Sequence, residues 1–178
     1  MKIKNLEERV KSVIRDVQDF PKPGILFKDI TPILLYPDLL QDMITEMANQ
    51  FEGIQIDAVA GIESRGYLFG VLLAQKLQVP FIMIRKEGKL PAKTIKESYD
   101  LEYGSATIEV HEDAIKTGSN VLIHDDLLAT GGTAIAAANL IKQKANVAGF
   151  SFVIDLTFLE GSKKLKEIKP IVKSLITY

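Results

Sequence analysis

Residues 121–134 read VLIHDDLLATGGTA, and this stretch decides the fold that we expect. An apolar run at 121–123 is followed by His124, by two adjacent carboxylates, Asp125 and Asp126, and then by a loop with two glycines. This order is typical of a buried strand that leads through a short loop into a helix. Because ligands of open α/β sheets bind at the carboxyl ends of the strands, the sequence predicts a site here.

The loop after the aspartates has the composition of an anion-binding turn. Gly131 and Gly132 let the backbone approach an anion without a Cβ in the way, and Thr130 and Thr133 add hydroxyl donors. The helix that follows offers unpaired N–H groups and a partial positive charge. The stretch contains neither a Walker loop nor a Gly-x-Gly-x-x-Gly turn.

The two aspartates narrow the class of ligand. They would repel a triphosphate, but ionised carboxylates accept hydrogen bonds from the vicinal hydroxyls of a sugar. A phosphate in the loop and a sugar at the carboxylates together indicate a ribose 5-phosphate site. The alternative is that Asp125 and Asp126 only cap the following turn and that the two glycines are a plain connector.

The whole chain has the composition of an ordinary globular domain. Its 178 residues are 47% hydrophobic and 25% charged, which suits a single domain over residues 1–178. A net charge of −1 gives no basic field for nucleic acid or an anionic membrane. The absence of cysteine excludes disulfides and thiolate metal sites, and the charged start MKIKNLEERVK is unlike a secretory signal. We therefore expect a cytoplasmic protein with neither nucleic-acid nor membrane partners.

Hydrophobic periodicity and turn residues predict strands that alternate with helices. The predicted helices lie at 5–17, 38–51 with Asp38 as cap, within 63–77, at 131–144 and at 161–168. The predicted strands lie at 57–62, 80–86, 99–104, 105–112, 120–125, 147–159 and 170–177. This order predicts an α/β fold with a central, mostly parallel sheet flanked by helices.

Two segments fall outside the alternation. Residues 1–35 are expected to form a small N-terminal hood, in which the proline-rich residues 20–32 form a defined loop. Residues 86–98 carry four lysines, a glycine and a proline but few apolar side chains, so they are predicted to form a flexible loop.

At this point a family resemblance is apparent. The stretch VLIHDDLLATGGTA resembles the phosphoribosyl pyrophosphate (PRPP) motif of the type I phosphoribosyltransferases, and its LLATGGT version resembles the members that act on adenine. The segments FPKPGILFKDITPIL, AGIESRGYLFG, IRKEGKLP and SYDLEYG agree, so the resemblance runs over residues 20–159. Two departures are His124, where the family usually has an aliphatic residue, and Lys28, where arginine is common.

The resemblance implies a reaction, a cofactor and an assembly. The reaction joins adenine to PRPP and gives AMP and pyrophosphate, in a homodimer that uses Mg²⁺. We expect no complete protein cage for this ion, because Mg²⁺ keeps several waters and would be held mainly by the substrate. The resemblance assigns the ribose 5-phosphate of PRPP or AMP to these residues: Asp125, Asp126, Ala129, Thr130, Gly131, Gly132 and Thr133.

Pyrophosphate requires cations and donors. The resemblance implies binding by Ser64, Arg65, Arg85, Lys86 and Lys89, with Arg65 and Lys89 also catalytic. The alternative for the lysine-rich segment is a solvated surface, and this is the reading that we keep for its other two lysines, Lys93 and Lys96. The resemblance also implies a cis peptide between Glu63 and Ser64.

The remaining roles concern the base and its proton. By resemblance, Glu102 accepts the proton that adenine loses, and Tyr103 helps to close the loop. Adenine is expected between Phe27 and Leu156, with its edge on backbone groups of Leu26 and Lys28. The alternatives are an exposed strand glutamate for Glu102 and core positions for Phe27 and Leu156.

Two other functions stay open at this stage. The chain could act on another purine or on orotate, or it could be a PRPP-sensing regulator that has lost catalysis. A regulator of this kind needs a basic face or an added DNA-binding module, and the net charge of −1 disfavours it. The two histidines lack the spacing of a zinc site, and His124 is expected to be packed and hydrogen-bonded.

Overall fold

A seven-stranded sheet forms the centre of the computed structural model, which describes residues 5–100 and 104–178. In spatial order its strands are β5 (Thr94–Asp100), β6 (Ser105–His111), β4 (Phe81–Lys86), β3 (Ala58–Ile62), β7 (Asn120–Leu128), β8 (Asn146–Asp155) and β9 (Val172–Thr177). The five strands from β4 to β9 in this order run parallel, and β5 and β6 form an antiparallel hairpin at one edge. The expected mostly parallel sheet is therefore confirmed.

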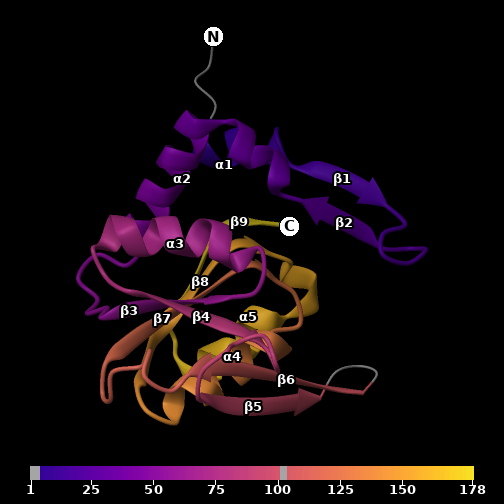
Figure 1. The fold of residues 1–178 in the computed structure, drawn as a ribbon. Coiled ribbons are helices and arrows are strands. Elements are labelled where there is room, and N and C mark those ends of the chain that lie inside the picture. Colours follow the sequence, from indigo (N-terminus) through magenta and orange to yellow (C-terminus); the bar gives the residue numbers. More distant parts are fainter. Residues whose placement is uncertain (1–4, 101–103) are drawn as a thin grey trace.

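Helices cover both faces of the sheet (Figure 1). They are α1 (Leu6–Lys11), α2 (Pro37–Asn49), α3 (Gly66–Leu77), α4 (Gly132–Lys142) and α5 (Gly161–Ile168), with 3₁₀ turns η1 (Thr31–Leu35) and η2 (Thr157–Leu159). The first three helices pack on one face and the last two on the other. Among the described residues, no helix is long and apolar enough to cross a membrane.

The alternation of side chains along the inner strands explains why their sequences are apolar throughout. On β7, Leu122 packs into the core under α2 and α3, whereas its neighbour Ile123 packs into the core under α4. Val59 and Ala60 divide in the same way on β3. A strand buried on both faces needs an unbroken apolar run, and this run is what the sequence shows at both places.

The hood differs from the expectation in its secondary structure. The predicted helix at 5–17 ends at Lys11, and the expected loop at 20–32 contains a strand. The segments β1 (Arg15–Gln18) and β2 (Leu26–Asp29) pair as a two-stranded antiparallel sheet, which lies beside the end of β9 (Figure 1). Residues 15–18 form a strand despite their helical spacing, because pairing with β2 provides hydrogen-bond partners for their backbone groups. The spacing of apolar residues within one segment gives no information about such pairing.

The start of α2 is also corrected. Asp38 does not cap the helix, because α2 begins at Pro37 and its N-cap residue Tyr36 makes no side-chain cap hydrogen bond. Pro37 occupies the first helical turn, where its missing N–H costs nothing. Asp38 lies in the same turn, where a negative charge is favourable beside the helix N-terminus.

Two boundaries near the predicted site move as well. Within the expected flexible loop at 86–98, Lys86 ends β4 and residues 94–98 belong to β5, where they pair with β6, so the connection is limited to 87–93. Strand β7 continues through Leu128, so Asp125 and Asp126 lie inside the strand and not at its end. In both cases pairing with a neighbouring strand extends the element past polar residues.

His124 is a buried polar residue in the centre of this fold. Its side chain is fully buried on β7, and Nδ1 lies 3.2 Å from Ser151 Oγ on β8, as expected for a packed and hydrogen-bonded histidine. Burial lowers the pKa of His124 to about 3, because the charged imidazolium loses its hydration. The neutral form is therefore part of the folded state.

This histidine predicts an acid-dependent loss of stability. The unfolded chain binds a proton at His124 near pH 6.5 and the folded chain does not, so the free energy of unfolding decreases as pH falls below about 6.5. The decrease attributable to this group is about 1.4 kcal/mol per pH unit. Denaturant unfolding at pH 7 and pH 5 measures it, with His124→Val as the comparison. The stability difference between wild type and variant should shift by about 2 kcal/mol between the two pH values, and an unchanged difference contradicts the assignment.

Candidate active site

An ion pair joins the turn after β3 to the C-terminal half of β7. Arg65 lies on the turn between β3 and α3, and its Nε is 2.9 Å from Oδ2 of Asp126 on β7. Asp126 is buried, whereas Arg65 is partly exposed. Two predicted site residues that are far apart in the sequence are thus in direct contact.

The two aspartates have different surroundings. Asp125 Oδ1 accepts a hydrogen bond of 2.8 Å from the backbone N–H of Asp126, and no ion pair joins Asp125 to any described residue. Burial, and then the negative charge of Asp126, raise the pKa of Asp125 well above its ordinary value. The sequence treats the pair as two ionised carboxylates, but the structure makes Asp126 the partner of a cation and Asp125 the one that resists ionisation.

A glycine sets the distance between α3 and this pair. A Cβ built on Gly66, the first residue of α3, would lie 2.8 Å from Asp125 Oδ1 and 3.1 Å from its Cα. The helix therefore packs directly against β7 at Asp125 because residue 66 has no side chain. This role of the glycine in the ESRG segment was not predicted from the sequence.

The anion-binding loop takes the expected strand–loop–helix form. Gly131 has φ of +84°, a conformation that favours glycine, and α4 begins at the next residue without a side-chain cap. A Cβ built on Gly132 would meet nothing within 4 Å. The N–H groups at the start of α4 are thus not covered by a capping side chain. Thr133 lies 3.4 Å from the hydroxyl of Tyr99, and Ala129 and Thr130 form the bend between β7 and Gly131.

The N-terminus of α5 packs against this loop. Gly161, the first residue of α5, is buried against the carbonyl oxygen of Ala129, and a Cβ at Gly131 would lie 3.3 Å from the carbonyl oxygen of Gly161. The two glycines therefore pack closely against one another's backbone. Sequence reasoning missed Gly161, because the contact joins segments that are separated by all of α4 and β8.

The predicted pyrophosphate residues lie at the ends of β3 and β4. Arg85 Nε donates to Glu63 Oε2 at 3.0 Å, and Arg85 Nη1 donates to the carbonyl oxygen of Lys89 at 3.2 Å. Ser64, Lys86 and Lys89 are exposed. The Glu63–Ser64 peptide is cis, as the resemblance implies. Arg65 thus follows β3, and Arg85 lies near the end of the adjacent strand β4.

The hood contributes an aromatic ring to this edge. The guanidinium carbon of Arg65 lies 4.9 Å from the centroid of the Phe27 ring, within the range of a cation–π contact. Phe27 is half-buried, and the edge of Phe20 packs on it with ring centroids 5.0 Å apart. Arg65 is thus in contact with the hood on one side and with Asp126 on the other.

The other residues predicted to bind the base occupy different positions. Leu26 and Lys28 alternate with Phe27 on β2, so their backbone groups point to the same edge of that strand. The Lys28 ammonium is bound elsewhere, 2.7 Å from Asp16 Oδ1 and 4.2 Å from the centroid of the Tyr178 ring. Leu156 follows β8 and packs, half-buried, on the core beneath α2 and α3. The proposed catalytic residues Glu102 and Tyr103 lie outside the described residues.

Glu109 is a further residue that sequence reasoning missed. It lies on β6, is only 2% exposed, and accepts hydrogen bonds from Lys89 N–H and Leu90 N–H, each at 3.0 Å. The sequence carries one signal of its burial, since Glu109 lies directly between the apolar residues Ile108 and Val110. A buried charge requires partners, but the sequence does not say which.

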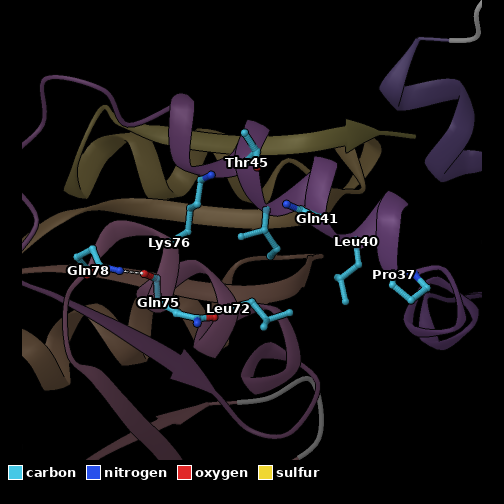
Figure 2. Close-up of a pocket in the computed structure, with 9 residues that line it drawn as sticks. Pro37, Leu40, Gln41, Thr45, Leu72, Gln75, Lys76 and Gln78 are labelled. Carbon is cyan, nitrogen blue, oxygen red and sulfur yellow. Dashed lines mark hydrogen bonds between the residues drawn. The ribbon is translucent and has the colours of Figure 1, made fainter.

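The described residues contain no cluster of potential metal ligands. Within residues 5–100 and 104–178 no group of three or more His, Asp or Glu side chains is arranged to hold a metal ion. A groove of about 500 Å³ between α2 and α3 is lined by none of the predicted site residues (Figure 2).

The chain is similar in sequence and in structure to known phosphoribosyltransferases. The family model for the phosphoribosyl transferase domain matches residues 30–175. The adenine phosphoribosyltransferase of Cytophaga hutchinsonii is 50% identical over 174 residues, which is 97% of this chain and 96% of that protein. The crystal structure of the Thermoanaerobacter pseudethanolicus enzyme superimposes with a TM-score of 0.92 at 46% identity, covering 96% of this chain and 99% of that one.

A third match is a ligand complex. The adenine phosphoribosyltransferase of Saccharomyces cerevisiae, solved with an imino-altritol bisphosphate and adenine, is 41% identical. It superimposes with a TM-score of 0.89 and covers 98% of this chain and 100% of that one.

The open space at Gly132 gives a test of the anion-binding loop. We expect Gly132→Ala to leave the free protein folded and up to about 1 kcal/mol more stable, because alanine loses less entropy in a helix. An anion at the helix N-terminus would meet the new Cβ, so AMP binding should weaken by about 10- to 100-fold, the equivalent of one or two charge-assisted hydrogen bonds. Calorimetric titration with AMP and a thermal melt measure the two effects. Unchanged AMP affinity would contradict the placement of the phosphate.

Proposed function

Because the chain belongs to the phosphoribosyltransferase family, we infer that it transfers the 5-phosphoribosyl group of PRPP to adenine, with AMP and pyrophosphate as products. The observation that carries this conclusion is 50% identity to an adenine phosphoribosyltransferase over 97% of the chain. The site agrees with this function, because β7 carries the paired aspartates and leads directly into the uncapped N-terminus of α4. The protein is thus a pentosyltransferase of purine salvage.

The 5-phosphate of PRPP binds in the bend formed by residues 129–133. The backbone N–H groups that begin α4 point toward this space, and the hydroxyls of Thr130 and Thr133 supply further donors. The ribose hydroxyls lie at Asp125 and Asp126. The different surroundings of these carboxylates support a division of roles, in which Asp126 exchanges a cation for a hydroxyl and Asp125 keeps its bond to the backbone.

The pyrophosphate group binds to Arg65, Arg85 and Lys89 near the carboxyl ends of the adjacent strands β3 and β4, with Ser64 and Lys86 as further donors. Both arginines hold carboxylates in this structure, Arg65 on Asp126 and Arg85 on Glu63. Each therefore makes its planar fork available to phosphate oxygens by exchanging one anionic partner for another. The exchange keeps a counter-charge beside each arginine at every stage.

Mg²⁺ is the cofactor that the family uses with PRPP. The two aspartates of β7 could provide only part of its coordination shell. The available donors are carboxylate oxygens, which suit a hard cation, but Asp126 is occupied by Arg65 and Asp125 by a backbone N–H. We propose that the ion arrives with PRPP and is held mainly by substrate oxygens and water. When bound, it neutralises charge on the pyrophosphate.

The reaction requires stabilisation of positive charge and removal of a proton. As the bond between the sugar C1′ and the pyrophosphate oxygen breaks, N9 of adenine forms a bond to C1′, and positive charge develops on the ribose. Asp126 supplies a carboxylate that is fixed beside that charge, and a fixed group needs no reorganisation during the reaction, whereas Asp125, which resists ionisation, binds the ribose. Glu102 accepts the proton that adenine loses from N7, and Tyr103 closes over the site.

Adenine binds against the hood. The half-buried ring of Phe27 supplies one face of the pocket and Leu156 the other, and backbone groups of Leu26 and Lys28 meet the edge of the base. The contact of Arg65 with the Phe27 ring supports this placement, since it joins the base pocket directly to the pyrophosphate residues. The ion pair of Lys28 with Asp16 keeps the lysine side chain away from the base.

We also propose a homodimer, which the resemblance implies. The exposed apolar side chains near the start of α2 and on α3 support it, and they are Leu34, Leu35, Tyr36, Leu68 and Val71. They adjoin the groove of Figure 2, in which Leu40 and Leu72 extend toward one another from α2 and α3. A purified chain that sediments as a monomer would contradict this assembly. The cytoplasmic location expected from the sequence stays a prediction.

The direct test of the function is base-selective turnover. With PRPP and Mg²⁺ the purified chain should convert labelled adenine to AMP, and omission of PRPP or chelation of Mg²⁺ should abolish the product. Hypoxanthine, xanthine and orotate serve as competing substrates under identical conditions. Turnover of one of these bases with none of adenine would replace the base assignment, and PRPP binding without any turnover would favour the regulator.

The role of Glu102 is tested by Glu102→Leu. Loss of a general base should lower kcat by about 10²- to 10⁴-fold, whereas the KM for PRPP should change little because the role proposed for Glu102 concerns the base and not the phosphates. Glu97→Leu is a matched control, because its carboxylate accepts hydrogen bonds from Asn139 on α4 and from Gln143, the residue that follows α4, and has no role proposed at the substrate. Steady-state kinetics with both substrates measure the effects. Full kcat in the Glu102 variant would remove this residue from the mechanism.

A further inference from the structure

The connection between β4 and β5, residues 87–93, is fastened at one point by a buried carboxylate. Glu109 Oε1 accepts hydrogen bonds from the backbone N–H groups of Lys89 and Leu90, each at 3.0 Å, and Oε2 accepts one from the Thr94 hydroxyl at 3.1 Å. All three donors belong to the connection or to the first residue of β5. The side chain of Glu109 forms no ion pair with any described residue, so these donors are its whole set of short-range partners.

The charge state of Glu109 agrees with this arrangement. Burial raises the pKa of Glu109, but the hydrogen bonds from Leu90, Thr94 and Lys89 outweigh that effect and hold the pKa below its ordinary value. The carboxylate is therefore ionised at neutral pH, and the bonds that it accepts are charge-assisted. An ionised group that is only 2% exposed is costly unless it is satisfied in this way.

The peptide of Lys89 is held from its other side as well. Arg85 Nη1 donates to the Lys89 carbonyl oxygen at 3.2 Å, while Arg85 Nε binds Glu63 at 3.0 Å. Glu109 and Arg85 are directly opposite one another in the pairing of β6 with β4. The backbone of Lys89 is thus bound through its N–H to one strand and through its C=O to the neighbouring strand. Its side chain remains exposed.

We propose that Glu109 is a positioning residue for pyrophosphate, because its buried carboxylate holds the backbone of Lys89 so that the lysine ammonium is presented to the leaving group. This inference rests on the proposed function of Lys89. Glu109 itself touches neither substrate. It acts by limiting the positions that the start of the connection can take, so less ordering is needed when PRPP binds.

The chain offers a matched pair of substitutions. Glu109→Gln keeps a carbonyl oxygen for the two N–H groups and an amide that can donate to the Thr94 hydroxyl. Glu109→Leu has a similar size but accepts nothing. Glu112→Leu is the control, because the Glu112 side chain binds the same connection only through Lys93 Nζ at 2.7 Å, in a pair whose lysine side chain is 84% exposed. The backbone N–H of residue 112, which donates to the Lys93 carbonyl oxygen at 2.9 Å, is kept in this variant.

The first measurement is amide hydrogen exchange in the absence of substrate. The amides of Lys89 and Leu90 should exchange faster in Glu109→Leu, and they should keep their protection in Glu109→Gln and Glu112→Leu. This arm tests the anchor whatever the protein catalyses. Unchanged protection of both amides in Glu109→Leu would overturn the inference.

The second measurement is kinetic. Glu109→Leu should lower kcat for AMP formation by about 10- to 100-fold, the size expected for a small misplacement of a catalytic group, and leave the KM for adenine unchanged. Glu109→Gln should restore most of the rate. In a Lys89→Met background, Glu109→Leu should cause no further loss, because the two residues then act as one unit. Losses that multiply in the double variant would show that Glu109 acts by some route other than Lys89.

The two arms separate the inference from the function on which it rests. A wild-type chain that fails to convert adenine would contradict the proposed function, and the exchange experiment would still decide whether Glu109 holds the connection. Full activity of Lys89→Met would remove Lys89 from the mechanism and overturn the inference with it.

Discussion

The contact between Arg65 and Asp126 is the interaction on which the arrangement of the site depends. It joins the turn after β3 to the C-terminal half of the neighbouring strand β7 at 2.9 Å, and the guanidinium carbon of Arg65 lies 4.9 Å from the centroid of the Phe27 ring in the hood. Three parts of the chain that carry different proposed roles, for ribose, pyrophosphate and base, are thus in contact through one side chain. A buried carboxylate needs such a partner, so the pair also explains how Asp126 is tolerated within β7.

Glycines make this close arrangement possible. Gly66 lets α3 begin directly on Asp125, and Gly161 lets α5 begin directly under the carbonyl of Ala129. In both places the first residue of a helix packs directly on β7 or on the residue that follows it, because a Cβ is absent. The same principle at Gly131, where φ is +84°, turns the chain from β7 into α4. The bend that we propose to bind phosphate is therefore held by contacts with α5 as well as by its own sequence.

Three charged side chains near the carboxyl ends of these strands, those of Arg65, Arg85 and Glu109, already have polar partners in the structure. Arg65 binds Asp126, Arg85 binds Glu63 and the Lys89 carbonyl, and Glu109 binds the backbone of Lys89 and Leu90. Under the proposed function, substrate binding exchanges the carboxylate partners of the two arginines for phosphate oxygens, which keeps a counter-charge beside each arginine. This feature distinguishes the edge from a plain basic surface, and it agrees with a chain whose net charge is only −1.

The sequence by itself determined the α/β class, the strand–loop–helix of residues 120–142 and the family, because these follow from local spacing and from motifs read along the chain. Only the tertiary structure decided the strands of the hood, the continuation of β7 through its aspartates, and the start of β5 at Thr94. It alone revealed Glu109 as an anchor and the unequal environments of Asp125 and Asp126. Each of these features depends on which strand or charged group lies beside the residue in the folded chain. Such partners are distant in sequence, so the hydrophobic spacing of a single segment does not indicate them.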